Sequence, residues 1–278
     1  AATATAVAAA ARATPRLRID KEELSTGFAT CRNNVLLLLA PQAAEPPPPT
    51  ELHAMTRDAA AAEVGQCSRL LRLVVDLAAP RFGCGRTAAA ALPAEEAAHL
   101  ARLNAEQRST VERCLGAEDY TLILGMPGTG KTTVIAHAVR ALHALGKSVL
   151  LSAYTHSALD NIVCKLKQMG VPLLRLGAPH RVHASLRDDT LDAISARASG
   201  TAALHDELSR RPVVATTALA LNHAPLWRRT FDVCIVDEAG QITEPVCLGP
   251  LRLARRFVLV GDHYQLPPLV REARAEQL

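Results

Sequence analysis

The glycine-rich stretch Tyr120–Thr133 has the residue types and the spacing of a phosphate-binding loop. It reads YTLILGMPGTGKTT and fits the pattern G-x-x-x-x-G-K-[ST]. Glycines allow the backbone to turn so that successive N–H groups face a phosphate, and the helix that follows directs its positive end at the same anion. The stretch therefore predicts a nucleotide site formed by Gly125, Gly128, Thr129, Gly130, Lys131, Thr132 and Thr133. The Lys131 ammonium would contact the β- and γ-phosphates, and the Thr132 hydroxyl would coordinate Mg²⁺.

Two adjacent acids follow an apolar run further along the chain. Val233–Gln241 reads VCIVDEAGQ, so Asp237 and Glu238 come at the carboxyl end of a predicted strand. In P-loop ATPases the first acid holds Mg²⁺, and the second orients and deprotonates the attacking water. We therefore predict Thr132 and Asp237 as the Mg²⁺ ligands. Glu238 is predicted as the catalytic base, and Lys131 as a second catalytic residue.

Two glutamines complete the predicted site. Phe257–Pro268 reads FVLVGDHYQLPP, a strand that leads into a polar loop in which Gln265 is suited to sense the γ-phosphate as a third catalytic residue. Leu103–Arg108 reads LNAEQR, and the amide of Gln107 can exchange hydrogen bonds with the adenine edge, which would select ATP over GTP. A plain surface helix explains LNAEQR equally well on its own.

A third polar loop follows the second predicted strand. Leu151–Asn161 reads LSAYTHSALDN, with Thr155, His156 and Ser157 at a helix start. Hydroxyls and free N–H groups at such a position suit contacts with a nucleic-acid backbone. For His156, a role as a metal ligand or catalytic base is disfavoured, because no partner acid is evident in the sequence.

The elements that must position these loops alternate from Leu103 onward. Apolar runs alternate with helical patterns, which predicts an α/β domain with a parallel sheet buried on both faces and ligands at the strand ends. The predicted strands are Tyr120–Leu124, Ser148–Ala153, Leu173–Leu176, Val213–Thr216, Val233–Val236 and Phe257–Val260. The predicted helices are Glu106–Cys114 with Asn104 as its N-cap, Thr132–Leu145, Ser157–Met169 and, mostly helical, Arg187–Leu208.

The first hundred residues have a different character. Residues 1–50 are rich in alanine and proline, and strand-like pieces over Arg16–Ala40, such as Val35–Leu39 after the turn signal Asn33-Asn34, predict a remnant of a β-barrel. Residues 51–100 predict a helical stalk, in which one helix runs over Leu52–Pro80 and another starts at Pro93. Residues 101–278 form the α/β domain. We expect the chain to be a piece of a longer protein.

The composition of the chain limits the classes of partner. A net charge of +4 is compatible with nucleic-acid binding without arguing for it, and 3% aromatic residues leave few platforms for base stacking. The seven cysteines lack metal-site spacing, which favours free thiols. The apolar run Val35–Ala40 is far too short for a membrane span, so we expect no membrane partner.

Six segments occur here in the order and spacing of superfamily 1 helicases: LNAEQR, GMPGTGKTT, SAYTHSALDN, VVATT, VDEAGQITEP and VGDHYQLPPLV. More narrowly, the chain resembles the eukaryotic DNA replication ATP-dependent helicase/nuclease family, closely from Leu103 to the end and more loosely over Leu52–Phe82. The resemblance implies a RecA-like P-loop domain that is the first of two motor domains. It also implies ATP and Mg²⁺ as ligands and 5′→3′ movement on single-stranded DNA in replication and repair, with replication and repair factors as possible partners.

The resemblance also implies residue roles and a cellular address. Gln107 would contact adenine, and Gln265 would read the γ-phosphate. The path of the single DNA strand over the protein, called the strand path below, would be lined by Tyr154, Thr155, His156 and Asn161. The address would be the nucleus, or sometimes the mitochondrion. An iron–sulfur cluster would belong to a nuclease domain upstream of this chain, and the second motor domain would lie beyond Leu278. One departure is Gly240, where the family usually has serine; both acids before it are intact.

Two other functions share this pattern of residues. An RNA helicase of the nonsense-mediated-decay type has the same order of motifs, although the exact residues of GMPGTGKTT and GDHYQLPPLV favour a DNA helicase. A nucleotide-dependent binding module without helicase turnover is the alternative from another class.

Overall fold

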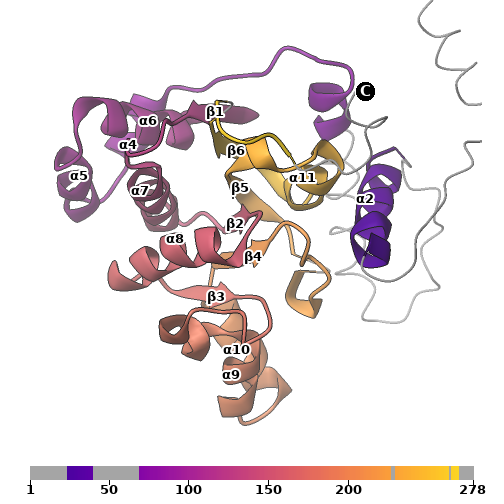
Figure 1. Ribbon diagram of the computed structural model, residues 1–278. Coiled ribbons are helices and arrows are strands. Elements are labelled where there is room, and N and C mark those ends of the chain that lie inside the picture. The colour runs from indigo at the N-terminus through magenta and orange to yellow at the C-terminus, as the bar shows by residue number, and fades with distance from the viewer. Residues whose placement is uncertain (1–23, 40–68, 227–228, 263, 269–278) are drawn as a thin grey trace, which may run out of the picture.

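A six-stranded, all-parallel sheet forms the centre of the computed structural model, which describes residues 24–39, 69–226, 229–262 and 264–268 (Figure 1). The strand order is β1-β6-β5-β2-β4-β3. The strands are β1 (Tyr120–Leu124), β2 (Val149–Ala153), β3 (Leu173–Arg175), β4 (Val213–Thr217), β5 (Phe231–Asp237) and β6 (Ala254–Gly261). All six predicted strands are present, which confirms the predicted α/β fold with a parallel sheet.

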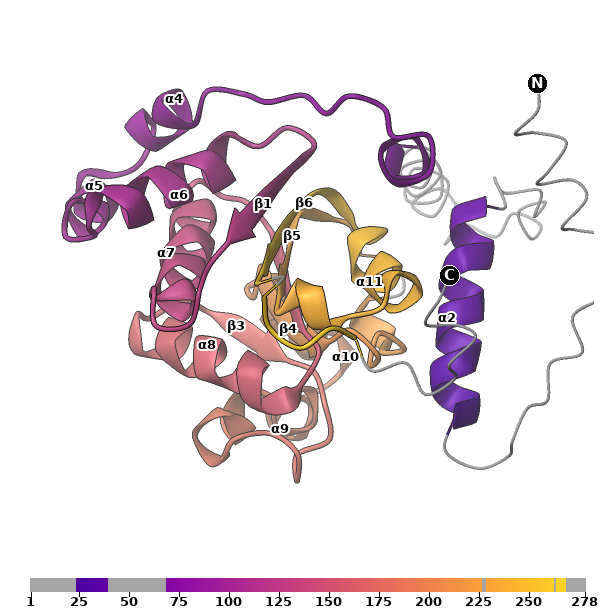
Figure 2. The ribbon, with the colours of Figure 1, turned by 45° about the horizontal axis from the view of Figure 1, so that its top comes forward.

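Helices cover the two faces of the sheet in two layers, because most strand residues are apolar and apolar side chains lie on both faces (Figures 1 and 2). The first layer contains α4 (Gly85–Ala90), α5 (Ala94–Ala101), α6 (Ala105–Gly116), α7 (Lys131–Ala144) and α8 (His156–Gln168). The second contains α2 (Leu24–Leu39), α9 (Leu191–Arg197), α10 (Thr201–Ser209) and α11 (Glu244–Leu251). At the edge strand β1, the side chains of Leu122 and Leu124 remain 65% and 59% exposed.

Four helices of the first layer, α5 to α8, start within one residue of the predicted start, whereas α4 was not predicted. Asn104 caps α6 in a reciprocal capping box, in which its side chain accepts from the Gln107 backbone N–H and the Gln107 side chain accepts from the Asn104 backbone N–H. Pro93 is the N-cap residue of α5. The region Arg187–Leu208, predicted as mostly helical, holds α9, α10 and the end of the short 3₁₀ helix Ala184–Asp189. Helix α11 follows the acidic loop and was not among the predicted elements.

The prediction of β-structure near the N-terminus is wrong for Val35–Leu39, which lies in helix α2. The sequence contains the reason: Cys31, Asn34, Val35 and Leu38 are all wholly or partly buried and recur at helical spacing. The Asn34 amide is 4% exposed and donates to the Pro245 carbonyl at 3.0 Å, where α2 packs against α11. Asn33-Asn34, predicted as a turn, therefore lies within a helix that packs on α11.

The predicted stalk is only partly within the described residues. Residues 69–74 are helical, so this helix ends before the predicted Pro80, while residues 52–68 lie outside the described part. Residues 1–23, which include the predicted strand-like positions Leu17 and Ile19, also lie outside it. Six cysteines fall in the described part and all are free thiols. Among the described helices, none has the length and apolarity needed to cross a membrane.

Asp119 joins the N-terminal segment to the α/β domain. Its carboxylate, 4% exposed, accepts from the guanidinium groups of Arg69 and Arg81 and from the Arg81 backbone N–H at 2.6 Å. Burial by itself would raise the pKa of Asp119, but the hydrogen bonds from Arg81 and Arg69 outweigh it and lower the pKa to about 2. Asp119 directly precedes β1, so this cluster anchors the segment at the start of the loop-bearing strand.

We expect Asp119→Asn to lower the free energy of unfolding by about 1–2 kcal/mol, because it removes two charge-assisted pairs of which the Arg81 pair is partly screened by water. Since the folded-state pKa lies below the ordinary value, the contribution is full above about pH 4 and is lost as the pH falls toward 2. Urea unfolding at pH 7 and at pH 3 measures it. Asp206→Asn, which removes an exposed pair with Arg210 on α10, is the control and should change little.

Candidate nucleotide site and strand path

The loop after β1 has the backbone geometry that a phosphate cradle requires. Gly128 and Gly130 have φ values of +80° and +86°, in the left-handed region where side chains are strained. Gly130 is the N-cap of α7, so the free N–H groups and the positive end of that helix face the loop. The Gly125 backbone N–H donates to the Gly261 carbonyl at 3.0 Å, which holds the loop beside the end of β6.

Lys131 lies at the centre of the predicted site. Its ammonium donates to the Gly125 carbonyl at 2.9 Å and lies 3.5 Å from the Glu238 carboxylate. A side chain at Gly125 would collide with Lys131, because an added Cβ would lie 2.5 Å from the lysine Cγ. The structure therefore brings two of the predicted catalytic residues together, and Gly125 is needed for their approach.

Asp237 and Glu238 are held at the end of β5 with carboxylate oxygens that lack partners. Asp237 is 5% exposed, and within the described part of the chain its Oδ1 and the Glu238 Oε2 are buried without a hydrogen bond. Burial, and then the neighbouring Glu238, raise the pKa of Asp237 to about 6. Glu238 also has a φ of +52°, a strained value for a residue with a side chain. Buried carboxylate oxygens without a hydrogen bond and a strained backbone are both costly, and such features gather at functional sites.

The oxygen donors available here fit Mg²⁺. Orphaned carboxylate oxygens and the Thr132 hydroxyl are the hard ligands that Mg²⁺ prefers, and this ion takes most of its remaining ligands from water and substrate phosphates. Within the described residues no cluster of three or more His, Cys, Asp or Glu side chains could hold a metal without such help. The site therefore suits a metal that arrives with a nucleotide.

The two predicted glutamines both contact loops of the site. The Gln107 side chain donates through Nε2 to the Thr129 carbonyl at 3.3 Å, so it supports the loop from α6. The Gln265 side chain donates to the Asp262 carboxylate at 3.2 Å, just after β6. The predicted contacts of Gln107 with adenine and of Gln265 with the γ-phosphate stay predictions.

The predicted strand path begins directly beside the acids. Ala153 at the end of β2 pairs in register with Asp237, and Tyr154, 41% exposed, follows. Thr155 caps α8 by accepting from the Ala158 backbone N–H at 3.2 Å, and the Asn161 side chain is exposed on the next turn. The four residues predicted for the path therefore share one helix N-terminus and its flank.

A buried ion pair beneath this helix was not predicted. Arg175, fully buried in β3, donates to the Asp160 carboxylate at 2.7 Å, and its Nη2 lies 2.9 Å from the His156 Nδ1. Because a guanidinium only donates, His156 must accept through Nδ1 and carry its proton on Nε2. Burial, followed by the charge of Arg175, lowers the pKa of His156, so the ring is neutral at pH 7. The missed signal was a single arginine within the apolar run LLRL.

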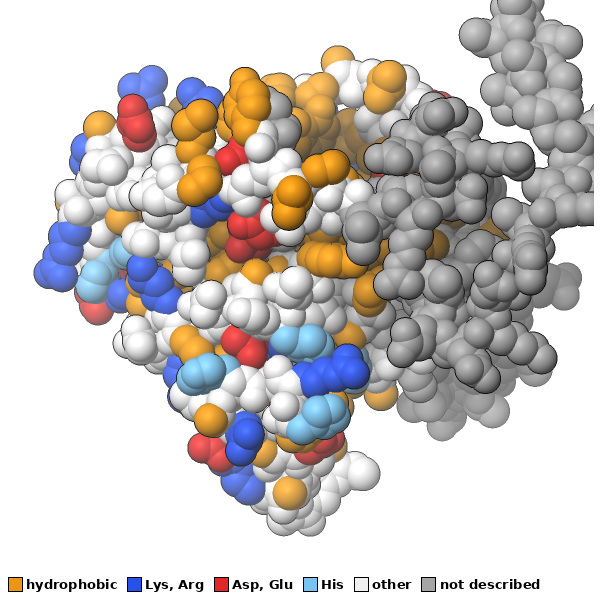
Figure 3. All heavy atoms as spheres, viewed as in Figure 1, with side chains coloured by type: hydrophobic (Ala, Val, Ile, Leu, Met, Phe, Trp, Pro, Cys, Tyr) orange, Lys and Arg blue, Asp and Glu red, His pale blue; other side chains and the backbone are white. Residues whose placement is uncertain are grey.

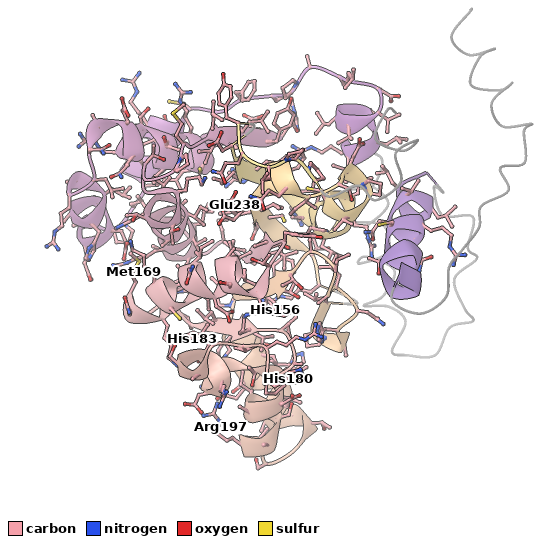
Figure 4. The ribbon with its side chains drawn as sticks, in the orientation of Figure 1. His156, Met169, His180, His183, Arg197 and Glu238 are labelled. Carbon is pink, nitrogen blue, oxygen red and sulfur yellow. The ribbon has the colours of Figure 1, made fainter. Side chains whose placement is uncertain are left out.

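The loop after β3 extends the polar surface around His156. The Asp160 carboxylate also accepts from the His183 backbone N–H at 2.7 Å, which fixes this loop against α8. His180 and Arg181 are exposed on the same loop, and both act on the pKa of His156, lowering it. Figure 3 shows histidine and cationic side chains gathered in this area, and Figure 4 shows His156, His180 and His183 near one another below Glu238.

Comparisons with known proteins agree with this geometry. A family model described as an AAA domain matches residues 102–202 and 195–272. The DNA replication ATP-dependent helicase/nuclease DNA2 of Mus musculus is 51% identical over 213 residues, which cover 74% of this chain and 20% of that protein. The corresponding proteins of Arabidopsis thaliana (JHS1) and Saccharomyces cerevisiae (DNA2) are 40% and 42% identical, over 94% and 93% of this chain and 18% and 17% of theirs. The chain spans about a fifth of the length of these curated relatives.

We expect Asp160→Asn to lower the free energy of unfolding by about 3–5 kcal/mol, because it leaves the buried Arg175 without its counter-charge. Urea unfolding at pH 7 measures the loss, and Asp188→Asn, at an exposed position, is the control.

Nitrogen-15 NMR of the unaltered chain should show His156 neutral with its proton on Nε2. A cationic ring at pH 7 would contradict the assigned network.

We expect Asp237→Asn to raise the free energy of unfolding by about 1–3 kcal/mol in the absence of added Mg²⁺ and nucleotide, because it replaces a buried carboxylate, one of whose oxygens has no hydrogen bond, with a neutral amide. Thermal and urea unfolding in a chelating buffer measure the change. A lower stability would mean that the Asp237 carboxylate has a structural partner rather than a ligand to bind.

Proposed function

Because this chain belongs to the AAA domain family, and its relatives at 40–51% identity are DNA replication ATP-dependent helicase/nucleases, we propose that it is the first motor domain of a superfamily 1 DNA helicase. The observation that carries the proposal is the single constellation of Lys131, Asp237 and Glu238 at the carboxyl edge of the sheet. It combines a cation for phosphates, a buried acid for a metal and a second acid for a water molecule.

ATP hydrolysis is the reaction that these residues suit. Lys131 can exchange its hydrogen bond with the Gly125 carbonyl for phosphate oxygens, since both partners are acceptors. Glu238 then keeps one oxygen close to Lys131, while its unpaired Oε2 can accept a proton from an attacking water. Lys131, the loop N–H groups and the end of α7 stabilise negative charge as it develops on the transferred phosphoryl group.

Mg²⁺ would be held by Thr132 and Asp237 and, when bound with ATP, supplies neutralisation of the phosphate charge. The other nucleotide contacts that we propose are made by the loop residues from Gly125 to Thr133 and, at the adenine, by Gln107. Gln265 follows β6 and hydrogen-bonds to Asp262, so a change at the γ-phosphate can alter this short loop. These assignments make the chain specific for ATP.

Single-stranded DNA is the proposed polymer, along a path that starts at Tyr154, Thr155, His156 and Asn161. The neutral His156 offers its Nε2–H as a hydrogen-bond donor, while the α8 N-terminus offers backbone N–H groups to phosphate oxygens. Movement in the 5′→3′ direction, an attached nuclease with its iron–sulfur cluster, replication or repair partners and a nuclear or mitochondrial address belong to the proposal for the longer protein. RNA is the alternative polymer, and a comparison of oligo-dT with oligo-rU distinguishes it from DNA.

This chain alone should bind ATP but turn it over poorly, so the prediction concerns a protein that also contains the second motor domain. There we expect Glu238→Gln to lower ATP turnover by about 10²–10³-fold while Mg·ATP still binds, because it removes a general base and leaves the cradle intact. Lys131→Ala should lose both binding and turnover while the fold is kept. Phosphate release, measured with oligo-dT, oligo-rU or no polymer, and equilibrium binding of a fluorescent ATP analogue are the readouts.

Glu112→Gln on α6 is a matched control, because it removes a carboxylate of the same size away from the loop. Undiminished turnover in Lys131→Ala would rule out the loop assignment. Loss of nucleotide binding in Glu238→Gln would show that Glu238 is not the base, and stimulation by oligo-rU alone would favour the RNA alternative.

A further inference from the structure

A lysine on α8 contacts α7, the helix that begins at the end of the phosphate loop and is called the nucleotide helix below. The Lys165 ammonium donates to the Thr133 hydroxyl at 2.7 Å, and α7 and α8 pack side by side (Figures 1 and 2). Thr133 is the third residue of α7 and follows Thr132, the proposed Mg²⁺ ligand. This hydrogen bond therefore ties the first turn of α7 to the helix whose N-terminus carries the proposed strand path.

Thr133 and Gln107 both lie close to Gly130, at the end of the phosphate loop. A Cβ added to Gly130 would lie 2.8 Å from the Gln107 Nε2 and 3.9 Å from the Thr133 Oγ1, so both groups lie on the side of Gly130 to which a Cβ would point. Gln107 also holds the Thr129 carbonyl. The end of the loop is thus contacted by Gln107 from α6, and Thr133, hydrogen-bonded to Lys165, lies near the same side of Gly130.

Lys165 differs from the neighbouring Lys167 in its ion pairing. Across the part of the chain that the structure describes, no carboxylate forms an ion pair with Lys165, whereas Lys167, two residues further on, pairs with Asp189 at 2.6 Å. A cation beside the first turn of a helix is disfavoured by the helix dipole. An anion bound at that end of α7 would remove this cost, and Lys131 already has Glu238 nearby.

The hydrogen bond also prepares the hydroxyl of Thr133 as a donor. A hydroxyl that accepts from an ammonium keeps its own hydrogen for donation, and the charge-assisted bond strengthens that donation. In the described residues, the Thr133 hydroxyl has no acceptor of its own. A phosphate oxygen of a nucleotide in the cradle is an acceptor of the right chemistry.

We propose that Lys165 is a positioning residue of the nucleotide site, which holds the Thr133 hydroxyl as a donor to a nucleotide phosphate and connects α8 to the loop. This inference rests on the proposed function, because it requires ATP to bind in the cradle. Lys165 itself does not touch the nucleotide; it acts through Thr133.

The test is a double-mutant cycle on the full 278-residue chain. Lys165→Met, Thr133→Val and the double variant are compared for binding of the fluorescent analogue mant-ATP with Mg²⁺, with thermal unfolding of each variant measured in parallel. We expect each single variant to weaken binding by about tenfold and the double variant to be no weaker than either one, since contacting groups are not additive. Lys165→Arg, which keeps a cationic donor, should recover most of the affinity, and Lys167→Met is the matched control without an effect.

The outcomes separate the inference from the proposed function. Unchanged affinity in Lys165→Met, or a double variant that loses the full product of the two single effects, overturns the role of Lys165 while ATP binding stands. Lower thermal stability with unchanged affinity assigns Lys165 a purely structural role and also overturns it. If the unaltered chain binds no ATP, and Lys131→Ala makes no difference, the proposed function and the inference fail together.

Discussion

Strands β2 and β4 are buried at every position, and helices cover both faces of the sheet around them. Polar side chains can therefore gather only where the strands end, and in a parallel sheet all carboxyl ends lie at one edge. The register sets this edge residue by residue: Leu124 pairs with Gly261, and Ala153 pairs with Asp237. As a result the phosphate loop, the two acids and the start of the strand path are neighbours, although they are far apart in the chain.

Four acids of this chain divide into two kinds, and the division separates stability from chemistry. Asp119 and Asp160 are surrounded by arginine and backbone donors, so their charges are satisfied and they join parts of the fold. Asp237 and Glu238 keep oxygens without partners, and Glu238 has a strained backbone. Carboxylate oxygens that are buried without a hydrogen bond destabilise the fold, which is why their presence here argues for ligands rather than for packing.

The nucleotide loop is supported by helices that the loop sequence does not contain. Gln107 contacts its end from α6, and Lys165 contacts Thr133 from α8. On the opposite side of α8, Asp160 and Arg175 orient His156 and hold the loop that contains His183. Helix α8 thus has polar contacts with the nucleotide helix on one flank and with the strand path on the other, which makes it the physical link between the two proposed ligands.

The sequence alone determined the strands, the phosphate loop and the acids, because each depends on residues close together in the chain: an apolar run, glycines at fixed spacing, and polar residues where the run stops. Even the capping of α6 by Asn104 was visible in this way. It misplaced Val35–Leu39, which lies in helix α2 where that helix packs against α11, and it missed α11 itself. Only the tertiary structure decided that Arg175 pairs with Asp160, that His156 is a neutral donor, and that Lys165 reaches Thr133. These contacts join residues on different elements, and their energies depend on burial and distance, which no local pattern of residues contains.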